Sequence, residues 1–496
     1  MQFSFQKVVK AKFSSMSAAA IFIFSASAHS MTVDNELPDL GASALSTLSI
    51  EKEKQLGNII FDQLRGQTAI LQDPIIIEYI NDLGNRLVAK SNDVNFPFTF
   101  FGVNNSQINA FAFYGGYIGI HTGLIAKSEN ESQLASVIAH EIAHVTQRHL
   151  ARSKEAASNR APLTLAGIVG SIILAAVSPQ LVMASMMATT AGTQQAMINY
   201  TRGNEQEADR IGMNILANSG YDPYAAAEFF TKLQEQVRYK SDIPAFLITH
   251  PLPDTRVTDA RLRAQQYEKK FYTDSLDFLL VKARIDARYV KNQADNSDTT
   301  NLVDRIKKTS GNKRFALQYQ LLLTLVDNKK IDKAFEIWKK LNEYAPGNLF
   351  LLDTYSDLAI AAETPEVALD ALAKAYKNKP NNYVVTLNYA NVALDAKQYD
   401  KAIELLEYFL LKKPNDLLAT QMLVDAYKDA KNMAKYNITK GELYALMARY
   451  NEAITFLDRA LAMMGKTDKA EVSRIQALKY QYRERQQYIK DIKGTI

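Results

Sequence analysis

The chain has 496 residues, of which 47% are hydrophobic and 22% are charged, and it contains no cysteine. This length exceeds a typical domain of about 100–200 residues, so at least two cores are expected, and the composition excludes wholesale disorder. The missing cysteine excludes a disulfide framework. Any metal site must therefore use histidine and carboxylate ligands.

Residues 1–28 have the pattern of a cleavable secretory signal peptide. Lysines precede a short apolar segment, 16–24, and Ala26-Ser27-Ala28 matches a small-x-small cleavage site. The apolar segment is shorter than the roughly 20 residues that cross a bilayer, which disfavours an uncleaved membrane anchor. Cleavage removes three lysines and no acidic residue, so the formal net charge falls from +5 to +2 and predicts no nucleic-acid partner. Export without cysteine favours the periplasm of a Gram-negative cell.

Helices and a small sheet are predicted next along the chain. Residues 46–90 carry apolar side chains at helical spacing. Residues 98–103 and 117–121 are short aromatic and β-branched segments and are predicted as strands. The second strand is a candidate edge that could pair with an extended substrate backbone. Residues 130–150 are predicted as one helix.

An H-E-x-x-H motif runs from His140 to His144 within this predicted helix. Residues four apart share a helix face, so both imidazoles can reach one tetrahedral ion. Glu141 then lies beside the metal, where its carboxylate can take a proton from bound water. His149 falls on the opposite face and is predicted to be a surface histidine. Because this motif also occurs by chance, a third ligand is required.

The segment 161–201 carries no formal charge, and its apolar core is too short for a transmembrane span. It is interpreted as a buried or capping hairpin. The alternative is a lid, or a surface that makes peripheral contact with the membrane or with a membrane-bound partner.

Glu205 is the candidate third ligand, in a sequence E-x-x-x-D that ends at Asp209. The two acids lie one helical turn apart, so Asp209 can accept a hydrogen bond from the far nitrogen of a ligating histidine and fix its tautomer. Glu207 points elsewhere and is a poor ligand candidate. The alternative, a solvated acidic helix face, is disfavoured by the coupling to the H-E-x-x-H motif.

The last histidine, His250, lies in a proline-stiffened segment that also carries Arg256. Both side chains are candidates to stabilise negative charge in the transition state. His250 could instead occupy the fourth zinc position of a resting enzyme and keep it closed. A third interpretation is structural, with His250 capping a loop and Arg256 paired with Asp254. Replacement of His250 by alanine separates them, because activity should fall, rise or stay unchanged, respectively.

From about residue 272 the sequence is helical and repeats every 34 residues. The period is marked by prolines and alanines, at Pro346, Pro380 and Pro414 and at Ala334, Ala368 and Ala402. An alanine twelve residues before a terminating proline in a 34-residue period indicates tetratricopeptide (TPR) repeats. Ala453, Leu457 and Ala460 indicate a further repeat that is shifted by 17 residues.

Several motifs together resemble the family of HtpX-like and CAAX-prenyl-endopeptidase-like zinc metallopeptidases over about residues 50–265. They are Asn109-Ala110-Phe111-Ala112, Gly115-Gly116, Gly123-Leu124, H-E-x-x-H and E-x-E-A-D. The resemblance implies gluzincin chemistry, with one Zn²⁺ per chain bound by His140, His144 and Glu205. With the export signal and the repeats, it implies unfolded or misassembled outer-membrane proteins as clients and the barrel-assembly machinery as a partner of the TPR domain. Membrane spans found in some relatives are missing from this sequence, so a substrate inside the bilayer is not expected.

The predicted fold is mainly α, with an α+β zincin-type metallopeptidase domain that contains a small sheet, followed by an all-α TPR solenoid. The predicted boundaries are 1–28 for the signal peptide, 29–270 for the peptidase domain and 271–496 for the repeats. The predicted function is a periplasmic zinc endopeptidase that acts on misassembled envelope proteins, with the repeats recruiting substrate or assembly machinery. The alternative is a periplasmic chaperone or assembly scaffold in which proteolysis is minor. Glu141 distinguishes them, because a structural zinc site needs no carboxylate beside a ligating histidine.

Overall fold

The computed structural model describes residues 48–67, 70–158, 191–239, 244–290, 299–464 and 469–494. The predicted signal peptide and most of the uncharged segment 161–201 lie outside these residues. Within the described ranges, no helix is long and apolar enough to span a membrane.

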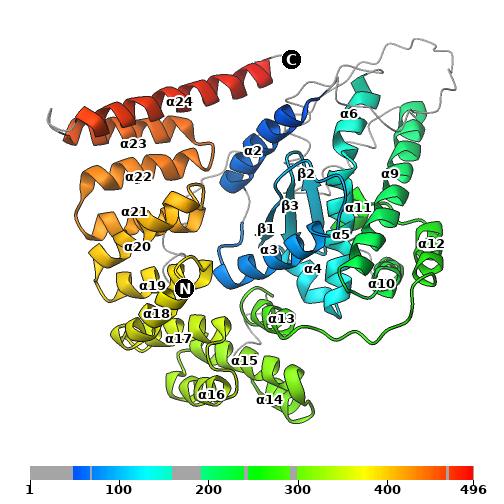
Figure 1. Ribbon diagram of the computed structural model, residues 1–496, viewed down its shortest axis with the longest axis horizontal. Helices are drawn as coiled ribbons and strands as arrows, with labels where there is room; N and C mark the ends of the chain where they lie inside the picture. The colour runs from blue at the N-terminus through cyan, green and yellow to red at the C-terminus, as the bar shows by residue number, and fades with distance from the viewer. Residues whose placement is uncertain are drawn as a thin grey trace.

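A three-stranded sheet lies at the centre of the peptidase half (Figure 1). Its order is β1-β3-β2, with β1 at Thr99–Val103, β2 at Ala110–Phe113 and β3 at Tyr117–His121. Strand β3 runs parallel to β1 and antiparallel to β2. The two predicted strands are present, but β2 was missed, and β3 is the central strand. The prediction that β3 forms a substrate-binding edge was therefore wrong, because the outer edges belong to β1 and β2.

Helices pack around this sheet, some of them directly on it and the others on neighbouring helices. They are α2 (Ile50–Gln67), α3 (Pro74–Val88), α4 (Thr122–Lys127), α5 (Glu131–Thr146), α6 (His149–Ser158), α9 (Ala191–Asn218), α10 (Tyr224–Tyr239), α11 (Ala245–Thr249) and α12 (Asp254–Ala264). Helix α5 is buried on almost every side, because α3, α9, α10 and β2 all pack against it. Such burial fits the central residues 134–143, which are small or apolar except for His140 and Glu141.

The predicted single helix over 130–150 is two helices in the structure. Helix α5 ends at Thr146, and α6 begins at His149. Between them Arg148 has a φ of 52°, which a continuous right-handed helix does not allow. Its Nε donates a hydrogen bond to Glu53 Oε1 at 2.8 Å, so an ion pair to α2 holds the break in place.

The remaining helices stack as antiparallel pairs in a curved row that passes around α2 and α3 (Figure 1). They are α13 (Leu276–Arg288), α14 (Thr300–Lys307), α15 (Gly311–Asp327), α16 (Ile331–Tyr344), α17 (Leu349–Ala361), α18 (Glu366–Asn378), α19 (Tyr383–Asp395), α20 (Tyr399–Lys412), α21 (Leu417–Asp429), α22 (Met433–Ala445), α23 (Tyr450–Met463) and α24 (Lys469–Gly494). The repeat alanines Ala334, Ala368 and Ala402 are fully buried between helices. The predicted mainly α fold, with a small sheet followed by a solenoid, is confirmed. The boundary predicted after residue 270 falls between α12 and α13.

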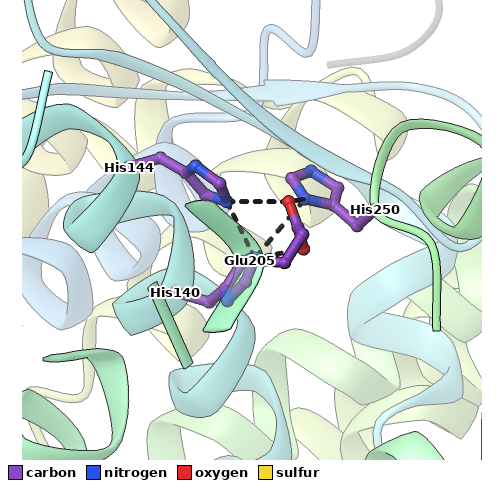
Figure 2. Close-up of side chains that lie close together, drawn as sticks. All are labelled: His140, His144, Glu205 and His250. Atoms are coloured by element: carbon purple, nitrogen blue, oxygen red, sulfur yellow. Dashed lines mark hydrogen bonds and ion pairs between the residues drawn. The ribbon is translucent and has the colours of Figure 1, made fainter. Parts of the chain in front are cut away.

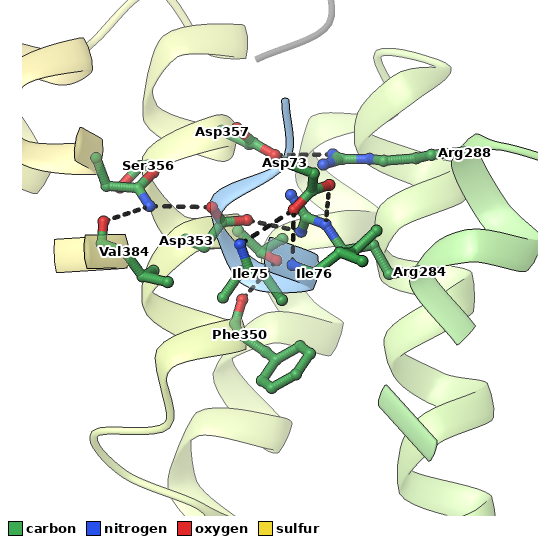
Figure 3. A network of polar contacts seen from close by, with 12 residues as sticks. Asp73, Ile75, Ile76, Arg284, Arg288, Phe350, Asp353, Ser356, Asp357 and Val384 are labelled. Carbon is green, nitrogen blue, oxygen red and sulfur yellow. Dashed lines mark hydrogen bonds and ion pairs between the residues drawn. The ribbon is translucent and has the colours of Figure 1, made fainter. Parts of the chain in front are cut away.

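The peptidase half and the first repeats share one continuous hydrophobic core, which includes buried residues of α3, α5, α13, α15 and α17. A buried polar network joins the same elements (Figure 3). Arg284 of α13 donates from Nε to Asp73, the N-cap of α3, at 2.6 Å, and from Nη1 to Asp353 of α17 at 2.7 Å. Asn388 of α19 donates to the other oxygen of Asp353 at 3.0 Å. The solenoid is therefore packed onto α3, and α3 in turn packs onto α5.

Candidate metal centre

Four candidate ligands converge from three helices. His140 and His144 lie one turn apart on α5, Glu205 is on α9, and His250 directly follows α11. Figure 2 shows the four side chains directed toward one point. One ligand atom from each residue lies within 4.8 Å of all the others. The structure therefore brings the three predicted ligands together and places beside them His250, for which a fourth ligand position was one of the predicted roles.

The distances between these atoms fit a small tetrahedral ion. His140 Nε2 lies 3.0 Å from His144 Nε2, and 3.4 Å from both Glu205 Oε2 and His250 Nδ1. Glu205 Oε1 lies 3.3 Å from His144 Nε2 and 3.0 Å from His250 Nδ1. An ion bound tetrahedrally at about 2.0–2.1 Å requires ligand atoms that are about 3.3 Å apart. The nitrogen and oxygen donors also suit a divalent transition metal.

The charges around this point also favour a bound cation. Glu141, Glu205 and Asp209 supply three carboxylates against the single guanidinium of Arg256. Glu141 is 1% exposed, and its Oε1 lies 3.4 Å from His250 Nε2 but accepts no hydrogen bond from any described residue. Three largely buried carboxylates beside one guanidinium are costly, so the site favours additional positive charge. A divalent ion at the four ligands would supply it.

The pKa values of the histidines fit the same picture. Burial opposes protonation of His140, but the carboxylates of Asp209 and Glu205 outweigh it and raise the pKa of His140 to about 10. The metal-free ligand set therefore holds a proton on His140 at neutral pH, and metal binding must displace this proton. Burial lowers the pKa of His144 to about 3, so His144 is neutral and free to act as a ligand. Burial alone would raise the pKa of Glu205, but the three surrounding histidines hold it well below its ordinary value.

Asp209 and Arg256 lie behind the ligands, on the side away from the cavity described below. Asp209 Oδ1 is 3.0 Å from His140 Nδ1, the nitrogen opposite the one directed at the metal position. Arg256 donates from Nε and Nη2 to the two oxygens of Asp209 at 2.7 and 2.8 Å, and its Nη1 is 2.7 Å from Glu205 Oε2. Arg256 thus holds one candidate ligand directly and another through Asp209.

The alternative pairing of Arg256 with Asp254 is not observed. Asp254 begins α12 and accepts a hydrogen bond from Gln234 at 2.9 Å instead. Arg256 is 2% exposed and is not among the residues that line the cavity beside Glu141. Its position therefore suits the orientation of ligands better than direct contact with a substrate oxygen.

The prediction that His149 is a surface residue was wrong. His149 is 3% exposed, and its Nδ1 lies 2.8 Å from His144 Nδ1. The sequence prediction assumed one continuous helix, in which His149 would lie on the face opposite His140. The break at Arg148 turns His149 toward His144 instead. Burial also lowers the pKa of His149 to about 4. Glu207, which was judged a poor ligand, is indeed outside the four-residue group and contacts His149 Nε2 at 3.1 Å.

A cavity of about 230 Å³ opens beside the candidate metal position. Strand β2 forms one wall with Phe111, Ala112 and Phe113, and residues of α5, α6 and α9 form the others. Glu141 and His144 line this cavity. Among the described residues, strand β2 pairs with β3 alone, so an extended peptide could add to its outer edge with a peptide bond near Glu141.

Two histidines on one helix, a glutamate from a second helix and a buried carboxylate beside them are the parts of a metallopeptidase site, here followed by TPR repeats. Comparison with known sequences agrees. Residues 77–264 match Peptidase family M48, and residues 359–424 match a Tetratricopeptide repeat. The chain belongs to peptidase family M48, so the predicted metalloendopeptidase domain and repeat domain are confirmed.

Curated relatives match much of the chain. The chain is 46% identical over 339 residues to the "Beta-barrel assembly-enhancing protease" of Yersinia pestis, and this match covers 68% of this chain and 69% of that protein. It is 47% identical, with the same coverage, to the protein of that name from Escherichia coli (strain K12). A more distant relative is "Mitochondrial metalloendopeptidase OMA1" of Arabidopsis thaliana, 33% identical over 134 residues, which covers 26% of this chain and 24% of that protein.

Proposed function

We propose that this chain is a zinc endopeptidase of the Gram-negative periplasm that removes misassembled envelope proteins, with outer-membrane β-barrel proteins as its main clients. The observation that carries the proposal is the convergence of His140, His144 and Glu205 beside the buried carboxylate of Glu141. The names of the Yersinia and Escherichia relatives support the client class. The signal-peptide pattern of residues 1–28 supports export.

One Zn²⁺ per chain is assigned to His140, His144 and Glu205. When bound, zinc supplies polarisation of the scissile carbonyl and a water of lowered pKa. Glu141 would accept the proton of the attacking water and pass it to the leaving amine, a role that suits a buried carboxylate at the cavity wall. Asp209 fixes the tautomer of His140. The edge of β2 holds the substrate backbone, so selectivity for side chains is weak.

His250 is assigned to closure of the resting site. A catalytic zinc site leaves one ligand position open for water or substrate. His250 would fill it, since its Nδ1 lies 3.0 Å from Glu205 Oε1 and 3.4 Å from His140 Nε2. The imidazole stacks on Phe246 with ring centroids 4.6 Å apart, which steadies it there. Substrate binding must then displace His250, and the restraint prevents indiscriminate proteolysis.

The solenoid is assigned to recruitment, either of substrate or of the barrel-assembly machinery, since TPR helices present extended binding surfaces. A second function is a chaperone or assembly scaffold in which zinc mainly holds the fold. The fourth candidate ligand favours it, because structural zinc sites are closed by four protein ligands.

Replacement of Glu141 by glutamine separates the two functions. The purified variant should bind one zinc per chain and lose about 10²–10⁴-fold of its hydrolysis of an unfolded outer-membrane protein. Glu129→Gln, which removes an exposed carboxylate of the same domain, is the control and should leave both unchanged. If cells that carry only Glu141→Gln retain intact outer-membrane assembly, the scaffold function is preferred.

A further inference from the structure

His144 contacts a second histidine on the side opposite the candidate metal position. Its Nε2 faces His140 and Glu205, whereas its Nδ1 lies 2.8 Å from His149 Nδ1. The two rings are nearly perpendicular, with an interplanar angle of 77°. On its far side, His149 Nε2 lies 3.1 Å from Glu207 Oε2. Arg152 completes the chain, because its Nη1 donates to the same carboxylate oxygen at 2.9 Å.

The positions of the protons in this chain follow from its two ends. Glu207 is held by Arg152 as an acceptor, so His149 carries its proton on Nε2 and donates it to Glu207. Nδ1 of the neutral ring is then an acceptor. His144 Nδ1 and His149 Nδ1 lie 2.8 Å apart, which is a hydrogen-bond distance, so one of them must donate a proton to the other. Because His149 Nδ1 is the acceptor, His144 carries its proton on Nδ1. Its Nε2 lone pair is therefore left for a metal.

We propose that His149, Glu207 and Arg152 are positioning residues that set the tautomer and the ring orientation of His144 as a metal ligand. The inference rests on the proposed assignment of His144 to zinc. His149 also lines the cavity beside Glu141, whereas Glu207 and Arg152 are not among its lining residues. Glu207 and Arg152 act on the centre through His149 and His144, as hydrogen-bond partners of ligating histidines do elsewhere.

The two ligating histidines are thus supported in different ways. His140 faces a carboxylate directly, through Asp209 at 3.0 Å. His144 reaches its carboxylate, Glu207, only through the neutral ring of His149. Both carboxylates are held by arginines, Asp209 by Arg256 and Glu207 by Arg152. The indirect arrangement orients His144 without adding a fourth carboxylate to Glu141, Glu205 and Asp209 beside the candidate metal position.

Metal binding by the purified full-length chain tests the inference. The readouts are the zinc dissociation constant, from competition with a chromophoric chelator, and the visible absorption spectrum of bound Co²⁺. Alanine at His149 or at Glu207 should weaken zinc binding about 10–100-fold and alter the cobalt spectrum. Asparagine at residue 149 should recover most of the affinity, because its side-chain oxygen can stand where Nδ1 accepts the proton of His144.

Glu442→Gln is the matched control, since it removes a carboxylate from an arginine pair in the solenoid and should leave zinc affinity unchanged. Circular dichroism of the metal-free variants identifies any that do not fold, and His149→Asn then carries the test. Affinity and spectrum like those of the unmodified chain in both alanine variants would overturn the inference while the proposed function stands. An unmodified chain that binds no zinc would overturn the proposed function, and this inference with it.

Discussion

Replacement of Arg284 by methionine should destabilise the whole chain, because Arg284 is the shared partner of two buried carboxylates. Methionine keeps the length of the side chain and removes its charge. Asp73 would keep hydrogen bonds from the backbone N–H groups of Ile75 and Ile76 at 3.2 and 3.3 Å. Asp353, fully buried, would keep one side-chain hydrogen bond from the described residues, that from Asn388 at 3.0 Å. One buried charge left without its partner costs about 3–5 kcal/mol in the free energy of unfolding.

Urea unfolding measures this loss through the fluorescence of Trp338, the single tryptophan of the chain, whose Nε1 donates to Leu351 O at 2.8 Å in the solenoid. Because the core is continuous from α3 to α17, loss of protease activity should follow the same transition as the fluorescence. Asp353→Asn in the Arg284→Met background should recover about 1–3 kcal/mol, since the amide is neutral and still accepts from Asn388.

Arg449→Met is the matched control, because it breaks an exposed ion pair with Glu452 and should cost less than about 1 kcal/mol. A loss of under 1 kcal/mol for Arg284→Met would refute the reasoning. So would separate unfolding of the solenoid and the peptidase half, because the network would then not join them.

Three further predictions concern the metal centre. His250→Ala should raise peptidase activity if His250 closes the site, and a fall in the rate of hydrolysis would instead assign it to the transition state. Asp209→Ala should weaken zinc binding about 10–100-fold in a chelator competition, since it leaves His140 Nδ1 without its acceptor and Arg256 without its main partner. Zinc binding at pH 7–8 should release about one proton, because the pKa of His140 without metal is raised to about 10 and the ligand must be deprotonated. Zinc affinity should therefore rise with pH up to that value, and calorimetry in buffers of different ionisation enthalpy measures the released proton.

The local part of the site was predictable because its spacing is set by one helix. His140 and His144 are four positions apart in the sequence, as are Glu205 and Asp209, so each pair shares a face in any α-helix. Nothing local signals the break that brings His149 to His144, since Arg148 adopts its positive φ while bound to a residue of α2. The sequence shows that a histidine, His149, follows the H-E-x-x-H motif. Only the fold shows that its side chain is directed at His144.

Long-range partners were the part that could not be predicted. Arg256 lies two residues from Asp254 but pairs with Asp209, 47 residues away, because α9 and α12 pack together. The strand order β1-β3-β2 depends in the same way on a long-range contact, because β1 pairs with β3 although β2 lies between them in the sequence. Arg284 and Asp73 are 211 residues apart, and each alone is indistinguishable from a solvated charge.

Helix α9 supplies three acidic side chains to this centre within five residues. Glu205 is a candidate ligand, Asp209 faces His140, and Glu207 faces His149. A shift of α9 along or about its axis therefore withdraws a ligand and both carboxylate supports in one movement. The metal affinity of the centre therefore depends on the position of one helix. Displacement of α9 would remove all three acidic side chains from the centre together.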